Sequence, residues 1–158
     1  MHVRPAELND IQLLIRLGRQ LLEMHLEFDN DYYRFEENFD ELFADWLKKQ
    51  IETPSYLLLV AEEINPEKRL IGFISGFIKT LYPWFRHKSV GHIAYMIVDP
   101  KFRKLGVGRS LSLVADAWFR EKNIAYVELY TDEKNIPGQK AWFSYGFLPF
   151  KKFLRKKI

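Results

Sequence analysis

The chain has 158 residues, a length that fits one domain built around a single sizeable core. Hydrophobic residues make up 47% of it and aromatic residues 16%, a composition that argues against global disorder. The net charge of +3 suits a phosphate-bearing ligand but is too small to indicate nucleic-acid binding. There is no cysteine, which excludes disulfides, thiolate metal sites and a cysteine nucleophile.

The N-terminal segment, Met1 to Pro5, has no apolar signal-peptide core. No stretch approaches the roughly 20 apolar residues that a membrane span needs. The lack of cysteine also fits a reducing compartment. We therefore expect a cytoplasmic protein without a membrane partner.

The first third of the chain is predicted to form one short strand and two helices. Residues 3–4 are typical of a strand, and Asn9 followed by Gln12 indicates a helix start of the capping-box kind. Apolar residues then recur at helical spacing over residues 11–22 and again over residues 39–47.

After residue 54 the pattern changes to strands. Residues 56–61 form a continuous apolar run, as in a strand covered on both faces, and residues 70–78 and 92–98 are predicted to form two more strands. Signals for a turn, a bulge or a close approach of strands interrupt this region: Asn65-Pro66, Gly72 and Gly76.

The last third is predicted to add a helix over residues 109–122 and a strand over residues 125–130. A short helix should begin near Pro137 and end at Gly146, and residues 147–154 are expected to form a final strand. The order β-α-α-β-β-β-α-β-α-β predicts a mixed α/β single domain.

The most informative stretch runs from Val98 to Arg109, where a strand ends, a basic loop follows and a helix begins. The free N–H groups and the dipole of a helix start form a ready anion site. Gly106 and Gly108 let the backbone approach a phosphate without a Cβ in the way. A pyrophosphate is the ligand that such a site fits best. The alternative is that the loop is only a glycine turn with solvated basic side chains and binds no ligand. Four cationic side chains surround the glycines: Lys101, Arg103, Lys104 and Arg109.

Two common phosphate-binding motifs do not fit this loop. No Gly-Lys-Ser/Thr follows at the spacing of a Walker loop. The third glycine of the dinucleotide-binding fingerprint is missing, and the loop comes late in the chain.

The loop instead resembles the acetyl-CoA pyrophosphate loop of the GNAT superfamily, through the run Val98-x-Pro100-x-x-Arg103-x-x-Gly106-x-Gly108. A second segment is similar to the family's closing Asn…Tyr…Gly-Phe motif, through Asn135, Trp142 and Gly146-Phe147. Residues 3–6 and Asp10-Ile11 are similar to a GNAT start, so the resemblance spans almost the whole chain.

The resemblance implies one GNAT-like α/β domain over residues 1–158, with a mixed central sheet of splayed strands flanked by helices. It implies an N-acetyltransferase that uses acetyl-CoA as cosubstrate and needs no metal. The pantetheine arm would lie along the strand before the loop, and the loop would cradle the pyrophosphate. Asn135 could equally cap a helix. The cofactor-binding residues implied in this way are Met96, Ile97, Val98, Arg103, Lys104, Leu105, Gly106, Val107, Gly108, Arg109, Asn135 and Trp142.

The match departs from the family at the catalytic positions. Trp142 stands where many members carry a tyrosine acid, and an indole only donates an N–H. Tyr145 is the alternative acid, unless it packs under Gly146. A backbone N–H at Met96 or Ile97 would polarise the thioester carbonyl.

The general base is also missing from its common place, since the central strand carries Ala94 or Tyr95 there. Glu128 is the best remaining candidate. His92, which strand alternation would place on one face with Met96, and a relay of waters are two others. The replaced tyrosine and the absent strand acid keep open a second function, an acyl-CoA-binding sensor or partner module without turnover.

The acceptor is expected to be a small-molecule or peptide amine. Residues 27–45 carry eight acidic side chains against one base, Arg34, and an acidic wall would attract polyamines, aminoglycosides or lysine-bearing peptides, unless it is an ordinary solvated face. The basic residues after position 150 are expected to be a solvated tail, not a nucleic-acid reader. Exposed aromatic residues would line a pocket or a homodimer contact: Tyr32, Tyr33, Tyr82, Trp84 and Phe85.

Overall fold

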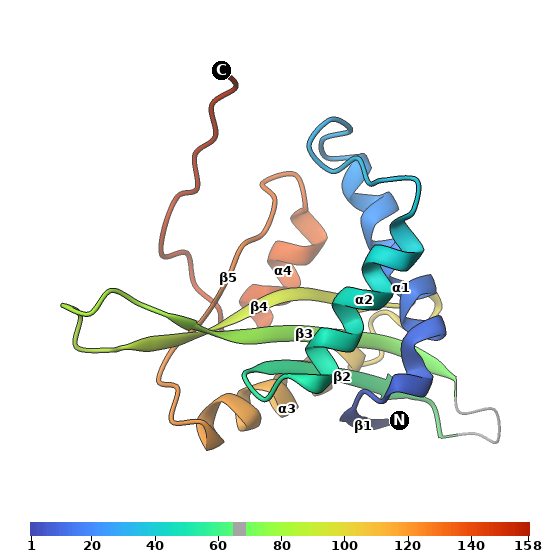
Figure 1. Cartoon of the computed structure of the whole chain (residues 1–158), viewed down its shortest axis with the longest axis horizontal. Helices are drawn as coiled ribbons and strands as arrows, with labels where there is room; N and C mark the ends of the chain where they lie inside the picture. The colour runs from blue at the N-terminus through green and yellow to red at the C-terminus, as the bar shows by residue number, and fades with distance from the viewer. Residues whose placement is uncertain (65–68) are drawn as a thin grey trace.

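The computed structural model describes residues 1–64 and 69–158, so the predicted turn at Asn65-Pro66 lies outside the described residues. Its centre is a five-stranded sheet in the order β1-β2-β3-β4-β5 (Figure 1). Neighbouring strands are antiparallel except for the last pair, which is parallel because a helix crosses between β4 and β5. The strands are β1 (His2–Pro5), β2 (Tyr56–Glu62), β3 (Leu70–Thr80), β4 (Ser89–Val98) and β5 (Val127–Leu129).

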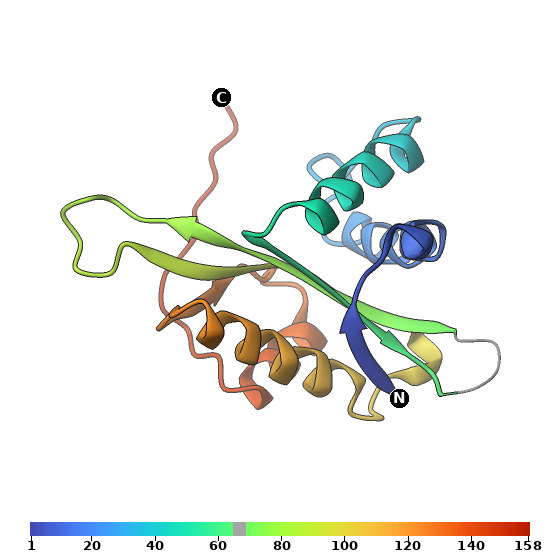
Figure 2. The ribbon, with the colours of Figure 1, turned by 60° about the horizontal axis from the view of Figure 1, so that its bottom comes forward.

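Helices cover both faces of this sheet, which confirms the mixed α/β prediction (Figure 2). On one face lie α1 (Ile11–Leu26) and α2 (Phe39–Glu52). On the other lie α3 (Val107–Glu121) and α4 (Ile136–Ser144). Two short 3-10 helices, η1 (Leu8–Asp10) and η2 (Pro100–Phe102), lead into α1 and into the loop before α3.

Two hydrophobic cores form because alternate residues of the inner strands point to opposite faces. Leu58 and Val60 of β2 pack towards α1 and α2, whereas Leu57 and Leu59 pack towards α3. The continuous apolar run of β2 therefore fills both cores, as its sequence predicts. Phe119 of α3 is among the largest fully buried side chains.

The first helix begins differently from the prediction at Asn9 and Gln12. The chain forms η1 first, and α1 starts at Ile11 with Asp10 as its N-terminal flanking residue. Asp10 does not cap α1, because its carboxylate accepts the Glu7 N–H at 2.8 Å and the Arg4 guanidinium at 2.7 Å.

The predicted final strand over residues 147–154 is wrong, since this segment has no regular secondary structure. The strand expected over residues 125–130 is shorter than predicted, since β5 has only three residues. Its edge is therefore too short for the tail to pair with it as a further strand. The tail instead runs outward as an extended segment (Figure 1), and Leu154 is 86% exposed. The short helix, by contrast, is confirmed, with Gly146 at φ 100° just after α4.

Arg4 joins the N-terminal strand to two other elements. Its guanidinium lies 2.7 Å from Asp10 Oδ2 and 2.7 Å from Glu62 Oε2, and both carboxylate side chains are largely buried. Burial by itself raises the pKa of Asp10, but the hydrogen bonds from Arg4 and from the Glu7 N–H outweigh it and lower that pKa below 3.8. The cluster therefore stabilises the fold while Asp10 is ionised.

Replacing Arg4 is predicted to destabilise the protein in a pH-dependent way. Arg4→Met should lower the free energy of unfolding at pH 7 by roughly 2 kcal/mol, because two buried carboxylates lose their cation. Since the native pKa of Asp10 is lowered, the difference from wild type should shrink as the pH falls below 3.8. Urea unfolding at pH 7 and pH 3.5 measures both effects. Lys157→Met, which breaks an exposed contact with Asp31, is the control and should leave the midpoint unchanged.

Candidate active site

The sheet opens between β4 and β5. The two strands pair only at Gly91, His92 and Ile93, opposite Val127, Glu128 and Leu129. Beyond this point the remainder of β4 pairs with β3 alone among the described residues. This is the splayed pair that the resemblance implies, and it leaves backbone groups on the β5 side of β4 available to an extended guest.

A β-bulge marks the position where the strands part. Ser75 is opposite Tyr95 and Gly76 is opposite Ile93, so Ala94 has no partner on β3. A Cβ at Gly76 would lie 2.7 Å from the His92 carbonyl oxygen, so only glycine permits this close approach.

The bulge changes which side chains share a face. Ile93 packs into the core beneath α3, so His92 points to the opposite face, which α1 and α2 cover. Past the bulge, Tyr95 contacts Trp46 of α2 at a ring distance of 5.8 Å, whereas Met96 packs towards α3. The expectation that His92 and Met96 share a face is therefore wrong, because strand alternation skips one residue at Ala94.

Asp99 holds the loop that follows β4. Its carboxylate accepts the Lys101 N–H at 3.0 Å and Arg69 Nη2 at 2.8 Å. Burial raises the Asp99 pKa, but these two hydrogen bonds outweigh it and leave the pKa below 3.8. The Arg103 side chain returns to the end of β4, where its Nε donates to the Val98 carbonyl at 3.2 Å.

The start of α3 presents free N–H groups beside cations. Gly106 precedes the helix at φ 83° and its carbonyl accepts the Ser110 N–H, so the N–H groups of residues 107–109 have no intrahelical partner. No side chain of the described residues caps this end. Lys104 adopts φ 62°, which turns the loop tightly before Gly106. Four exposed cations flank it: Lys101, Arg103, Lys104 and Arg109.

α4 packs against this same helix start. A Cβ built on Gly108 would lie 2.5 Å from the Tyr145 hydroxyl oxygen, and Arg109 Nη2 donates to the Ser144 carbonyl at 2.9 Å. Trp142 lies edge-on to Tyr145 at a ring distance of 5.7 Å. Asn135 is a helix cap, as the alternative reading expects, because its Oδ1 accepts the Gly138 N–H at 3.0 Å. Sequence spacing gave no signal for the contact between Gly108 and Tyr145.

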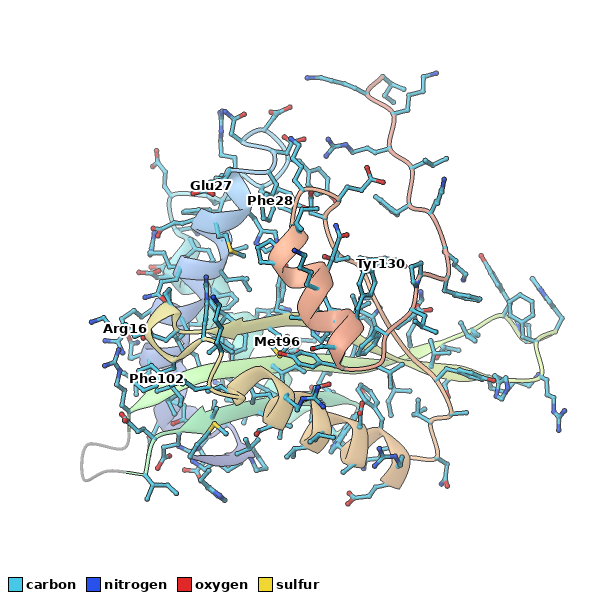
Figure 3. The ribbon with its side chains drawn as sticks, turned by 180° about the vertical axis from the view of Figure 1, so that it is seen from behind. Arg16, Glu27, Phe28, Met96, Phe102 and Tyr130 are labelled. Carbon is cyan, nitrogen blue, oxygen red and sulfur yellow. The ribbon has the colours of Figure 1, made fainter. Side chains whose placement is uncertain are left out.

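Glu128 lies in a charged cluster at the junction of β4 and β5. Its Oε1 accepts Lys79 Nζ at 2.8 Å and lies 3.8 Å from His92 Nδ1. Burial raises the Glu128 pKa, but the Lys79 ammonium outweighs it and leaves that pKa below its ordinary value. Tyr130, just beyond β5 (Figure 3), lies beside His92 at a ring distance of 5.1 Å.

An apolar cavity of about 240 Å³ lies between α1, α2 and β4. The acidic residues of the stretch 27–45 do not line it; Asp29 and Asp31 instead pair with Arg155 and Lys157 of the tail. The acidic residues therefore form no wall around this cavity, and the alternative of an ordinary solvated face fits them better. The lining residues are Gly18, Leu21, Leu22, Phe39, Leu42, Phe43, Trp46 and Tyr95.

The aromatic residues of the sequence separate into different places. Tyr82 and Trp84 stack at 4.7 Å on the exposed tip of the hairpin between β3 and β4, which projects from the body (Figures 1 and 2). Tyr33 instead donates to Asp132 at 3.2 Å, joining the α1–α2 connection to the segment before α4. None of these three lines the cavity.

Within the described parts of the chain, no helix is long and apolar enough to span a bilayer. The same residues contain no group of three or more His, Asp or Glu side chains placed to hold a metal ion.

The close contact between α3 and α4 predicts a specific coupling. Gly108→Ala should lower the free energy of unfolding by about 1–2 kcal/mol, because the new methyl group overlaps the Tyr145 hydroxyl. Adding Tyr145→Phe should recover most of this loss. Gly106→Ala is the control. Its Cβ would meet no atom within 4 Å, but a φ of 83° is strained for alanine, so this variant loses stability for a reason that Tyr145→Phe should not rescue. Additive effects at 108 and 145 in urea unfolding would contradict the contact.

Comparison with known proteins agrees with this geometry. The sequence matches the Acetyltransferase (GNAT) family over residues 19–147. A probable N-acetyltransferase HLS1 from Arabidopsis thaliana is 31% identical over 112 residues, which cover 61% of this chain and 28% of that protein. The chain thus spans under a third of the length of this relative.

Two solved structures share the fold across nearly the whole chain. An aminoglycoside 6′-N-acetyltransferase from Acinetobacter baumannii has a TM-score of 0.78 and 15% identity, covering 99% of this chain and 97% of its own. A predicted acetyltransferase with acetyl-CoA from Clostridium acetobutylicum has a TM-score of 0.75 and 20% identity, covering 99% and 95%. Because the family match extends over most of the chain and the fold agrees, the chain belongs to the Acetyltransferase (GNAT) family.

Proposed function

We propose that this protein transfers the acetyl group of acetyl-CoA to a primary amine by direct attack in a ternary complex. The observation that carries the proposal is the alignment of two features. β4 parts from β5 at the Ala94 bulge, and the same strand then leads directly into the uncapped, cation-flanked start of α3. An extended molecule with amides at one end and a pyrophosphate at the other fits both features.

We assign the pantetheine arm to the open side of β4. Met96, Ile97 and Val98 lie past the last residue pair with β5, and the backbone groups of alternate residues along this edge face away from β3, towards the place assigned to the amides of the arm. The bulge at Ala94 places irregular backbone where the arm would end. An N–H group in this part of β4 would polarise the thioester carbonyl.

We assign the pyrophosphate to the residues from Arg103 to Arg109. Lys104, Leu105 and Gly106 form the turn, and Val107 and Gly108 contribute N–H groups of the first helical turn. The exposed cations supply the opposite charge. The likeness to a structure that contains acetyl-CoA supports this cosubstrate.

The three candidates on and around α4 receive different roles. Asn135 uses Oδ1 as a helix cap, which leaves its amide NH2 to donate to the cofactor arm. Trp142 packs beside that arm with Tyr145 against its ring. The Tyr145 hydroxyl lies beside Gly108, so we assign it to the phosphate end and not to the leaving thiolate. With a thiol pKa of about 8.5, the thiolate can leave without a side-chain acid.

In the reaction, the lone pair of the neutral amine forms the N–C bond and the C–S bond breaks with its electrons on sulfur. An ammonium substrate releases two protons overall, of which one ends on the thiolate and the other passes to the solvent. Holding both reactants in one site supplies much of the acceleration. This chain contributes the binding surface, the polarising backbone and a path for the first proton.

We propose that the acceptor is a small-molecule or peptide amine with an apolar substituent. The cavity beside Tyr95 is lined by aliphatic and aromatic side chains, and it lies on the face of β4 opposite α3. A bare polyamine would gain little there, because it has no apolar group to bury. The second candidate function, an acyl-CoA-binding module without turnover, is favoured by one observation, namely that Trp142 stands where many family members carry a tyrosine acid.

The cofactor placement predicts a charge effect at one end of α3. Lys104→Glu should weaken coenzyme A binding at least tenfold, because it places a negative charge beside the pyrophosphate. Lys122→Glu, the same change just after the far end of α3, is the control and should bind as the wild type does. Isothermal titration calorimetry in low salt measures both. Equal affinity in the two variants would remove the pyrophosphate from this loop.

The acetyl transfer itself is tested by release of free thiol from acetyl-CoA. Phenethylamine should give faster release than spermidine or kanamycin, because its ring can enter the apolar cavity. Leu42→Glu at the cavity wall should reduce this preference without affecting coenzyme A affinity. Cofactor binding without thiol release on any amine would favour the binding-module function instead.

A further inference from the structure

His92 occupies a particular position at the junction of the two splayed strands. It lies within the last stretch where β4 and β5 are paired, directly opposite Glu128, and two residues before the bulge at Ala94. At about 3.3 Å per residue, His92 and Ala94 are separated by roughly 7 Å along the strand. Because His92 points away from α3, it lies on the face that also carries Tyr95 and the apolar cavity.

The imidazole of His92 has an unused polar atom. The residue is 8% exposed, and its Nδ1 is fully buried without a hydrogen-bond partner among the described residues. The carboxylate oxygen Oε1 of Glu128 lies 3.8 Å from Nδ1. Since Nδ1 is enclosed, the small exposed part of the side chain belongs to its other atoms. A buried imidazole nitrogen with no partner is costly and calls for an explanation.

We infer that His92 is the group that takes the first proton from the acceptor amine, and that Glu128 positions and stabilises it. In this arrangement, which rests on the proposed function, Nδ1 carries its hydrogen towards Glu128 and Nε2 is the acceptor. The ammonium gives one proton to Nε2, directly or through one water, and becomes the neutral nucleophile. The imidazolium formed has a carboxylate beside it, and it returns the proton to solvent after transfer.

The surroundings of the ring suit this role. Burial lowers the pKa of His92 below 6.5, although Glu128 acts in the opposite direction, so the ring is neutral and able to accept a proton at pH 7. Four ionisable groups face the cluster: Glu128 from β5, Lys79 from β3, Tyr130 beyond β5, and Lys151 of the tail, whose charge acts on Glu128. Glu128 itself is held ionised by Lys79, so it is a weak base but a good partner for an imidazolium.

The test is the pH dependence of kcat/KM for thiol release with phenethylamine. The wild type should show a plateau between the pKa of His92 and that of the amine, about 10. Without the base, only free amine reacts, so His92→Gln should lose about 100-fold at pH 7 and its rate should climb tenfold per pH unit. A His92→Gln enzyme that keeps the plateau, or a wild type that climbs without one, would overturn the inference.

Two further variants separate catalysis from structure. Glu128→Gln should keep the plateau but move its acidic limb to lower pH, because the carboxylate that raises the pKa of His92 is gone while Lys79 remains. His87→Gln, on the exposed β3–β4 hairpin, is the matched control and should leave the profile unchanged. If His92→Gln does not fold, judged by its melting curve and coenzyme A affinity, the wild-type and Glu128→Gln profiles still decide the matter.

A readout without turnover distinguishes the two proposals. The pKa of the His92 imidazole, followed by NMR in the coenzyme A complex, should lie below 6.5 and fall further in Glu128→Gln. If the wild type releases no thiol with any amine, the proposed function fails regardless of this titration. If it releases thiol but the His92 pKa does not respond to Glu128→Gln, the proposed function stands and the pairing of His92 with Glu128 is refuted.

Discussion

The bulge at Ala94 is the constraint on which the geometry of the site depends. One extra residue in β4 bends the strand and ends its pairing with β5 three residues after that pairing begins. It also reverses the faces of the residues that follow: Tyr95 points towards α2 and Met96 towards α3, the opposite of what uninterrupted alternation from His92 predicts. Gly76 of β3 makes this possible, since a Cβ there would lie 2.7 Å from the His92 carbonyl oxygen of β4. The strand edge proposed for the cofactor arm and the cavity proposed for the acceptor thus both lie on β4 just past this residue.

The second element of the site, the loop before α3, is held from two sides. Asp99 fixes its beginning through Arg69 and the Lys101 N–H, and α4 fixes its end through Tyr145 and Ser144. Lys104 in a left-handed conformation carries a local cost that this support offsets. Because this helix start is uncapped and its loop is already held in place, binding an anion would cost little conformational entropy, which is the advantage of preorganisation.

The sequence was informative where local chemistry decides the structure. Apolar periodicity located the helices α1 and α2. The continuous apolar run of β2 indicated a strand covered on both faces of the sheet, and the basic glycine loop before α3 indicated an anion site. It failed where distant contacts decide. The carboxylate of Asp10 binds Arg4 instead of capping α1, which begins at Ile11. The strand β5 has three residues, too few for the tail to pair with it as a further strand. The orientation of His92 relative to Met96 depended on the bulge at Ala94; Gly76 indicated a bulge or a close approach, but not which residue of β4 would be the extra one.

The α1–α2 connection shows how the two sides of the opening are coupled. It is bound to the β5–α4 segment through Tyr33 with Asp132 and through Lys134 with the Phe28 carbonyl, and Figure 3 shows Phe28 at this end of the molecule. Two of its acidic residues, Asp29 and Asp31, also pair with the basic tail. The charges of Asp29 and Asp31, which the sequence offered for substrate attraction, are thus used within the chain, in exposed and therefore individually weak contacts. We propose that the apolar cavity behind them selects the acceptor, because burial of a substituent, rather than charge, would discriminate between amines there.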